Sequence, residues 1–115
     1  MDISAFETKE TTAVTIKNPR TGVDTDAVIT VHGVFSGRFR QAYIEYQRRN
    51  PSGSIADLDS EALATLTESW AGLEKGGKPY KFNKANAVAL YGSSGPMRNQ
   101  IIAAILESDR FLASA

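Results

Sequence analysis

The chain has 115 residues, of which 42% are hydrophobic and 23% are charged, a composition that can bury the core of one domain and that excludes wholesale disorder. Lys and Arg together number 13, as do Asp and Glu, and the resulting zero net charge weighs against a protein that binds nucleic-acid phosphates over a broad surface. The absence of cysteine excludes disulfides, thiol catalysis and cysteine-bound zinc.

The opening residues, MDISAFETKE, are polar and acidic, unlike a secretory signal. No apolar run approaches the roughly 18–20 residues that a bilayer-spanning helix needs. We therefore expect an intracellular, single-domain protein without a membrane partner.

Residues 10–31 predict an antiparallel β-hairpin. The segments ETTAVTIK and DAVITV are rich in β-branched residues, and the intervening NPRTGVDTD carries proline and glycine turn signals. Alternation along the two strands places Val14, Ile16, Val28 and Thr30 on the inner face. An isolated hairpin is marginal in water, so we expect this one to pack on helices.

The first two helices are expected over residues 37–49 and 57–74. Ser36 is a suitable N-cap for the first helix, and Asp57 or Asp59 for the second. Glycines are common where helices end, so the Gly-Gly pair at 76–77 is expected to close the second helix. The apolar stripe of that helix comprises Leu63, Leu66, Trp70 and Leu73.

Two further helices are expected over residues 84–91 and 95–112. Asn83 suits the N-cap of the former, and Pro96 suits the first turn of the latter. The segment KPYKF before Asn83 is expected to be extended, because a residue that precedes proline avoids the α region. The predicted fold class is α+β and predominantly α, with an N-terminal β-hairpin packed on about four α-helices.

No catalytic or cofactor constellation can be assembled from the sequence. The GGK triplet lacks the Ser or Thr that a phosphate-binding loop requires, because Pro79 follows Lys78. His32 is the only histidine and is expected at a surface or strand edge, and no serine lies in a G-x-S-x-G elbow. We expect no enzyme activity, cofactor or metal.

Charge is segregated between the first two predicted helices. The first is rich in arginine and the second begins with carboxylates, which are either two ordinary solvated faces or complementary surfaces that dock head to tail between copies. The second interpretation predicts a homo-oligomer with contacts through Arg38, Arg40, Arg48, Arg49, Asp57, Asp59 and Glu61.

Aromatic and apolar residues suggest where a partner binds. The last predicted helix has a broad apolar face, which is typical either of a fully buried helix or of one with a partner-binding surface. Trp and Tyr are frequent interface anchors, although core packing is the commoner role for Trp70. The candidate partner-binding residues are Trp70, Tyr80, Phe82, Ile102, Leu106 and Phe111.

A small DNA-binding helix-turn-helix regulator is the alternative function. The last two predicted helices are joined by a short glycine-bearing turn, as that motif requires. The final helix, however, offers only Arg98, Asn99, Gln100 and Arg110 as base or phosphate readers, and the rest of its surface is largely apolar.

The ordered motifs of the chain resemble the tail assembly chaperones of long-tailed bacteriophages. The series VHGVFSGRF, WAGL, GKPYKFN, NAVALY, PMRNQI and a terminal RF carries the resemblance, best over residues 66–111 and more loosely over 28–40. Ala85 departs from the pattern, because relatives often carry a glutamate there. The matching positions are Trp70, Gly72, Gly77, Phe82, Asn86, Leu90, Pro96, Gln100, Ile101 and Phe111.

The resemblance implies a non-enzymatic morphogenetic factor. Such proteins are made in the host cytoplasm, are absent from the mature virion, coat the long tape measure protein, and help to recruit the major tail protein for tube polymerisation. Many are also made in a longer form by a programmed ribosomal frameshift, and this chain would be the short form.

Overall fold

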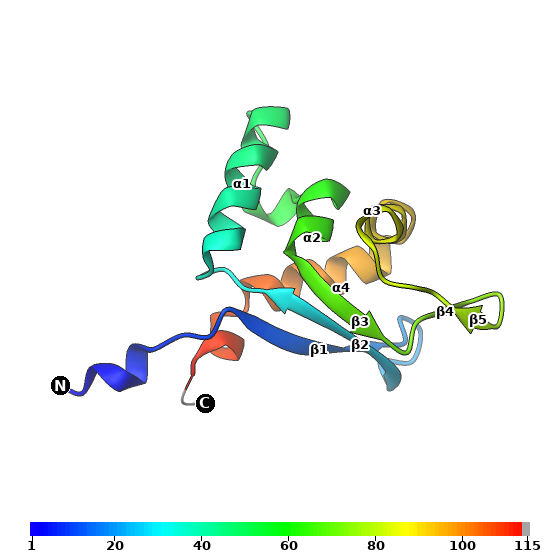
Figure 1. Ribbon diagram of the computed structural model, residues 1–115, viewed down its shortest axis with the longest axis horizontal. Helices are drawn as coiled ribbons and strands as arrows, with labels where there is room; N and C mark the ends of the chain where they lie inside the picture. Colours follow the sequence, from blue (N-terminus) through cyan, green and yellow to red (C-terminus); the bar gives the residue numbers. More distant parts are fainter. Residues whose placement is uncertain (114–115) are drawn as a thin grey trace.

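The computed structural model describes residues 1–113 and confirms an α+β fold, in which an N-terminal β-hairpin packs on α-helices (Figure 1). The helices and strands of this part of the chain are β1 (Thr11–Lys17), β2 (Asp24–His32), α1 (Gly37–Arg49), α2 (Ser60–Leu66), β3 (Thr67–Ala71), β4 (Glu74–Lys75), β5 (Lys78–Pro79), α3 (Lys84–Ser93) and α4 (Gly95–Leu106). Short 3₁₀ turns are η1 (Ile3–Phe6), η2 (Ile55–Asp57) and η3 (Ser108–Phe111).

The main sheet is antiparallel with strand order β1-β2-β3, and the α-helices lie on one side of it (Figure 1). The predicted hairpin is confirmed, but its inner face on β2 is shifted by one residue. Ile29 pairs with Val14 and is fully buried, whereas Val28 and Thr30 are only partly buried. The sequence VITV has apolar residues at both parities, so only the register with β1 decides which set faces the core.

The predicted helix over 57–74 is wrong in its second half. The α2 helix ends at Leu66, and the chain continues as β3, which pairs with the open edge of β2. The spacing of Trp70 and Leu73 fits a helix, but pairing with β2 satisfies the same backbone groups and overrides local propensity. Gly72 then takes φ +78° against the Asp26 carbonyl, a conformation that a helix cannot accommodate.

The glycine pair also has a different role from the predicted one. Gly76 and Gly77, at φ +60° and +79°, form the turn between β4 and β5 instead of ending a helix. Two consecutive residues with positive φ suit a tight hairpin turn, for which glycine has no steric cost. The extended segment predicted after the glycines is confirmed where β5 pairs with β4.

Most predicted helix starts are confirmed. The side chains of Ser36, Asp59 and Asn83 accept backbone hydrogen bonds at the N-termini of α1, α2 and α3. Asp57 instead lies in η2. The last helix is shorter than the predicted 95–112, because α4 stops at Leu106 and η3 follows.

The core lies between the sheet and the helices. Its largest fully buried side chains come from α1 (Tyr46), α3 (Tyr91), η3 (Phe111), β2, α2 and α4, together with Leu58 just before α2. Figure 1 shows that α1 stands out at one side of the body and that the N-terminal segment leaves the body at the end opposite the β4–β5 hairpin.

Candidate interaction surfaces

Two of the charges predicted to pair between copies pair within one chain. Arg49 donates two hydrogen bonds to Asp59, from Nε to Oδ2 at 3.0 Å and from Nη2 to Oδ1 at 2.9 Å. Asp59 also accepts a bond from the Ala62 N–H, as the N-cap of α2. Partial burial raises the pKa of Asp59, but the bonds from Arg49 and Ala62 outweigh it and hold the pKa below its ordinary value.

Several other predicted charges also have partners within the chain. Arg38 lies 3.7 Å from Glu68, Glu61 lies 3.6 Å from Lys84, and Asp57 accepts a hydrogen bond from Ser54. Arg40 and Arg48 are different, since neither makes an ion pair within residues 1–113.

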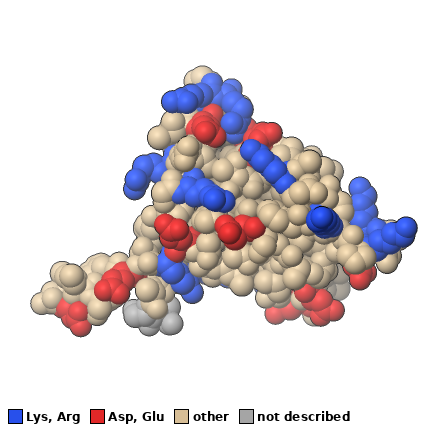
Figure 2. All heavy atoms as spheres, viewed as in Figure 1, with Lys and Arg blue, Asp and Glu red and all other residues tan. Residues whose placement is uncertain are grey.

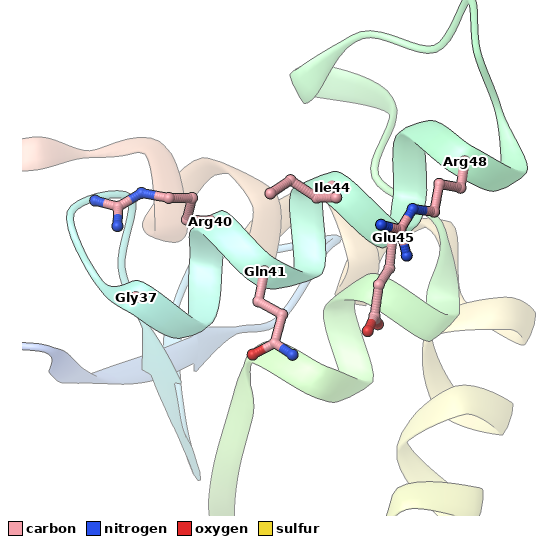
Figure 3. A pocket seen from close by; sticks show the side chains of 6 residues that line it. All are labelled: Gly37, Arg40, Gln41, Ile44, Glu45 and Arg48. Carbon is pink, nitrogen blue, oxygen red and sulfur yellow. The ribbon is translucent and has the colours of Figure 1, made fainter.

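The outer face of α1 carries two adjoining hollows, which together we call the α1 groove. One, of about 290 Å³, is shown in Figure 3 and is lined by Gly37, Arg40, Gln41, Ile44, Glu45 and Arg48. The other, of about 350 Å³, includes Phe35 and Tyr43 and shares Arg40 and Ile44 with the first. Phe35 is 50% exposed and Ile44 is 45% exposed, so the groove combines cationic and apolar character.

The aromatic residues on either side of Gly76 and Gly77 form a corner with defined geometry. The ring of Trp70 stacks on Tyr80 at 5.7 Å and meets Phe82 edge-on at 5.0 Å. Trp70 Nε1 donates to the Tyr80 carbonyl at 2.7 Å, and the Tyr80 hydroxyl donates to the Asn86 carbonyl. This aromatic corner (Trp70, Tyr80 and Phe82) therefore joins β3 to the start of α3.

The aromatic corner is partly open. All three rings are partly buried, and a hollow of about 190 Å³ beside Tyr80 is lined also by Leu73, Ala89 and Leu90. Exposed aromatic surface next to a hollow is suited to an apolar segment of a partner.

The apolar residues predicted on the last helix are mostly core residues. Phe111 is fully buried against Gly33, where even a Cβ atom would collide with its ring, and Ile102 is 7% exposed. Neither can line a partner surface in this fold, and only Leu106 of the three is partly exposed. Of the two alternatives for the broad apolar face of this helix, full burial or a partner-binding surface, the structure shows burial of α4 against the sheet and the other helices.

His32 was expected at a surface or strand edge and is instead 7% exposed on β2, the middle strand. Its Nε2 lies 2.6 Å from Glu68 Oε2. The hydrogen bond with His32, followed by the charge of His32, lowers the pKa of Glu68. The sequence pattern could not predict the contact between His32 and Glu68. Glu68 lies near His32 because residues 67–71 form β3 beside β2, whereas the sequence predicts a helix for these residues.

The residues that the DNA-binding alternative requires are engaged elsewhere. Arg98 donates to the Leu58 carbonyl, and Gln100 bonds to both the N–H and the carbonyl of Lys17. Arg110 pairs with Glu107. Of the four candidate readers, Asn99 alone is exposed and makes no side-chain bond among residues 1–113.

Within residues 1–113, no group of three or more His, Asp or Glu side chains is placed to hold a metal ion. In the same stretch, every helix is too short or too polar to cross a bilayer. Comparisons with protein-family models, with curated proteins and with solved structures gave no match to this chain.

Proposed function

We propose that this protein is a tail assembly chaperone of a long-tailed bacteriophage. In this role it self-associates, binds the tape measure protein in the host cytoplasm, helps to recruit the major tail protein, and is absent from the mature virion. The ordered motif series supports the assignment. The observation that carries the binding role is that the chain has two separate open surfaces, the α1 groove and the aromatic corner.

The two surfaces have different chemistry, which supports different roles. The α1 groove offers Arg40 and Arg48, which make no ion pair within residues 1–113, beside Ile44, and we assign it to contacts between copies. The aromatic corner offers the stacked rings of Trp70 and Tyr80 beside a hollow that Leu73, Ala89 and Leu90 line together with Glu74, Lys75 and Ser93. We assign this corner to apolar side chains of the tape measure protein. A coat of this kind shields apolar surface of a long partner until the tail tube polymerises.

Co-expression with the neighbouring tape measure protein tests the function. We expect the soluble fraction of the tape measure protein to rise several-fold and the two proteins to co-purify. Ala89→Glu, which places a charge in the hollow beside Tyr80, should reduce the recovered complex at least tenfold. Ala85→Glu is the matched control, because Ala85 is also an exposed alanine of α3 but does not line that hollow.

Absence of a complex with the unmodified chain, together with no gain in solubility, would reject the proposed function. The gene neighbourhood provides an independent test. We expect the gene to lie between those of a major tail protein and a very long, helical reading frame, with a slippery heptanucleotide near its stop codon.

A further inference from the structure

The first seven residues are all exposed and form an arm that projects from the body of the protein. Within this N-terminal arm (residues 1–7), the η1 turn buries no residue, and Met1, Ile3 and Phe6 are 100%, 73% and 66% exposed. The base of the arm is anchored, because the Ala113 N–H donates to the Glu7 carbonyl at 2.9 Å and the adjoining Thr8 bridges to Leu112. The arm is thus a projecting segment with exposed apolar side chains, and backbone contacts to residues 112 and 113 hold its base in place.

The large exposed apolar side chains of the chain fall almost entirely in two places. Residues 1–113 expose six of them, of which three are on the arm and two, Phe35 and Ile44, line the α1 groove. The sixth is Val23, in the loop between β1 and β2. Exposure of apolar side chains to water is unfavourable, so contact between the arm and the α1 groove would be favoured by burial of both sets of side chains.

The two surfaces also have opposite charges. The arm carries the carboxylates Asp2 and Glu7 against the Met1 ammonium and contains no Lys or Arg, so it is net acidic. The groove carries Arg40 and Arg48, which make no ion pair within the described part of the chain, against one carboxylate, Glu45. Figure 2 shows the same contrast, with acidic side chains on the projecting arm and basic side chains over α1. Charge complementarity of this kind sets the register of a contact.

The arm of one chain points away from the groove of the same chain. The Thr8–Leu112 bridge directs residues 1–7 outward along the long axis of the molecule, whereas α1 rises from the body in a different direction (Figure 1). The occupant that the structure supplies is therefore the arm of another copy.

We propose that the N-terminal arm of one copy occupies the α1 groove of a second copy, with Ile3 and Phe6 against Phe35 and Ile44. Each copy carries one arm and one groove, so the contact can close reciprocally in a dimer or repeat from copy to copy in a larger multimer. The inference rests on the self-association part of the proposed function and identifies the two surfaces that make it.

Mixed cysteine variants test the contact directly, because the natural chain contains no cysteine. Ser4→Cys and Gln41→Cys, both at exposed positions, are purified separately as full chains, mixed and oxidised gently. We expect the mixture to give a disulfide-linked dimer at least tenfold faster than Ser4→Cys mixed with Thr21→Cys, a control at an exposed position in the loop between β1 and β2, outside the α1 groove. Equal rates in the two mixtures would overturn the proposal.

Size measurements by light scattering provide the second readout. Phe6→Asp and Ile44→Glu should each shift the multimer to a smaller species, whereas Val23→Asp, an equally exposed apolar position outside both surfaces, should leave the size unchanged. Circular dichroism verifies that each variant is folded. A multimer of unchanged size in both variants would reject the arm contact while leaving self-association intact.

A double variant, Ser4→Cys with Gln41→Cys in one chain, separates the two possible groove occupants. A disulfide within one chain at high dilution would show that the arm folds onto its own groove and would overturn the proposal. If the arm contact holds but the chain fails to solubilise the tape measure protein, the proposed function fails and this inference stands.

Discussion

Gly72 is held in a conformation that other residues rarely adopt. Its φ of +78° lies in the left-handed region, and a Cβ atom there would collide with the carbonyl of Asp26 on the neighbouring strand β2. Gly76 has a similar φ of +60° but open space around it. A side chain at Gly76 would meet backbone strain alone, whereas one at Gly72 would meet both strain and a steric clash, so comparing the two positions distinguishes these effects.

We predict that Gly72→Ala lowers the free energy of unfolding by roughly 2–4 kcal/mol, because strain of about 1–3 kcal/mol is joined by displacement of β2. Gly76→Ala has the strain alone and should cost roughly 1 kcal/mol. Urea unfolding of both variants measures the difference, and equal losses would show that the contact with Asp26 is readily relieved.

Asp59 links stability to pH. Its pKa is lower in the folded chain than in the unfolded one, so its contribution is present above the unfolded value of about 3.9 and is lost as pH falls through the folded value. We predict that Asp59→Asn, which keeps a capping oxygen but not the charge, is less stable than the natural chain at pH 7. The difference should narrow below pH about 4. Melting temperatures of both proteins from pH 7 to 3 measure this, and a constant difference would contradict the assignment.

At the scale of elements, β1 is an edge strand that is partly covered by a side chain from α4. Gln100 accepts a hydrogen bond from the Lys17 N–H and donates one to the Lys17 carbonyl, each at 2.8 Å. The amide thereby takes the place of a neighbouring strand and leaves fewer free backbone groups for another chain.

We predict that Gln100→Met, which preserves length but removes both hydrogen bonds, raises the exchange rate of the Lys17 amide hydrogen severalfold. Global stability should fall by no more than about 1 kcal/mol per bond, because the site is solvent-exposed. Asn99→Met, at the adjacent exposed position, is the control. Unchanged exchange at Lys17 would indicate that the pairing does not persist in solution.

At the scale of the whole molecule, the charges do not form two opposed faces. Arg49 and Asp59 satisfy each other, and Arg38 and Glu61 have partners of the other sign within 4 Å. Arg40 and Arg48 of the α1 groove make no ion pair within residues 1–113 and are among the charges left for contacts between copies. In the contact proposed above, they meet the carboxylates of the projecting arm.

We predict that Arg40→Glu combined with Arg48→Glu weakens multimers more at about 50 mM salt than at about 500 mM, because added ions screen exposed charges. Arg20→Glu combined with Lys78→Glu, at two exposed positions outside the α1 groove, is the control, because it changes the net charge by the same amount. Light scattering at the two salt concentrations measures the effect. A loss that is independent of salt would contradict the electrostatic origin.

The sequence by itself determined the features that depend on neighbouring residues. Ser36, Asp59 and Asn83 cap helices because a side-chain oxygen reaches a backbone N–H three residues away, and such a signal is readable without the rest of the fold. The hairpin and the α+β class followed in the same way from β-branched runs and turn residues. The aromatic corner was also identifiable as a concentration of Trp70, Tyr80 and Phe82.

Tertiary structure decided the features that depend on distant partners. Residues 67–71 became a strand because β2 offers an unpaired edge, and that choice moved Trp70 onto the sheet and brought Glu68 to His32. Arg49 found Asp59 within its own chain, and Phe111 found a place against Gly33 that no local pattern encodes. Which charges and apolar side chains remain free for a partner is set only after these internal contacts are made, so the arm and the α1 groove could be recognised only in the folded molecule.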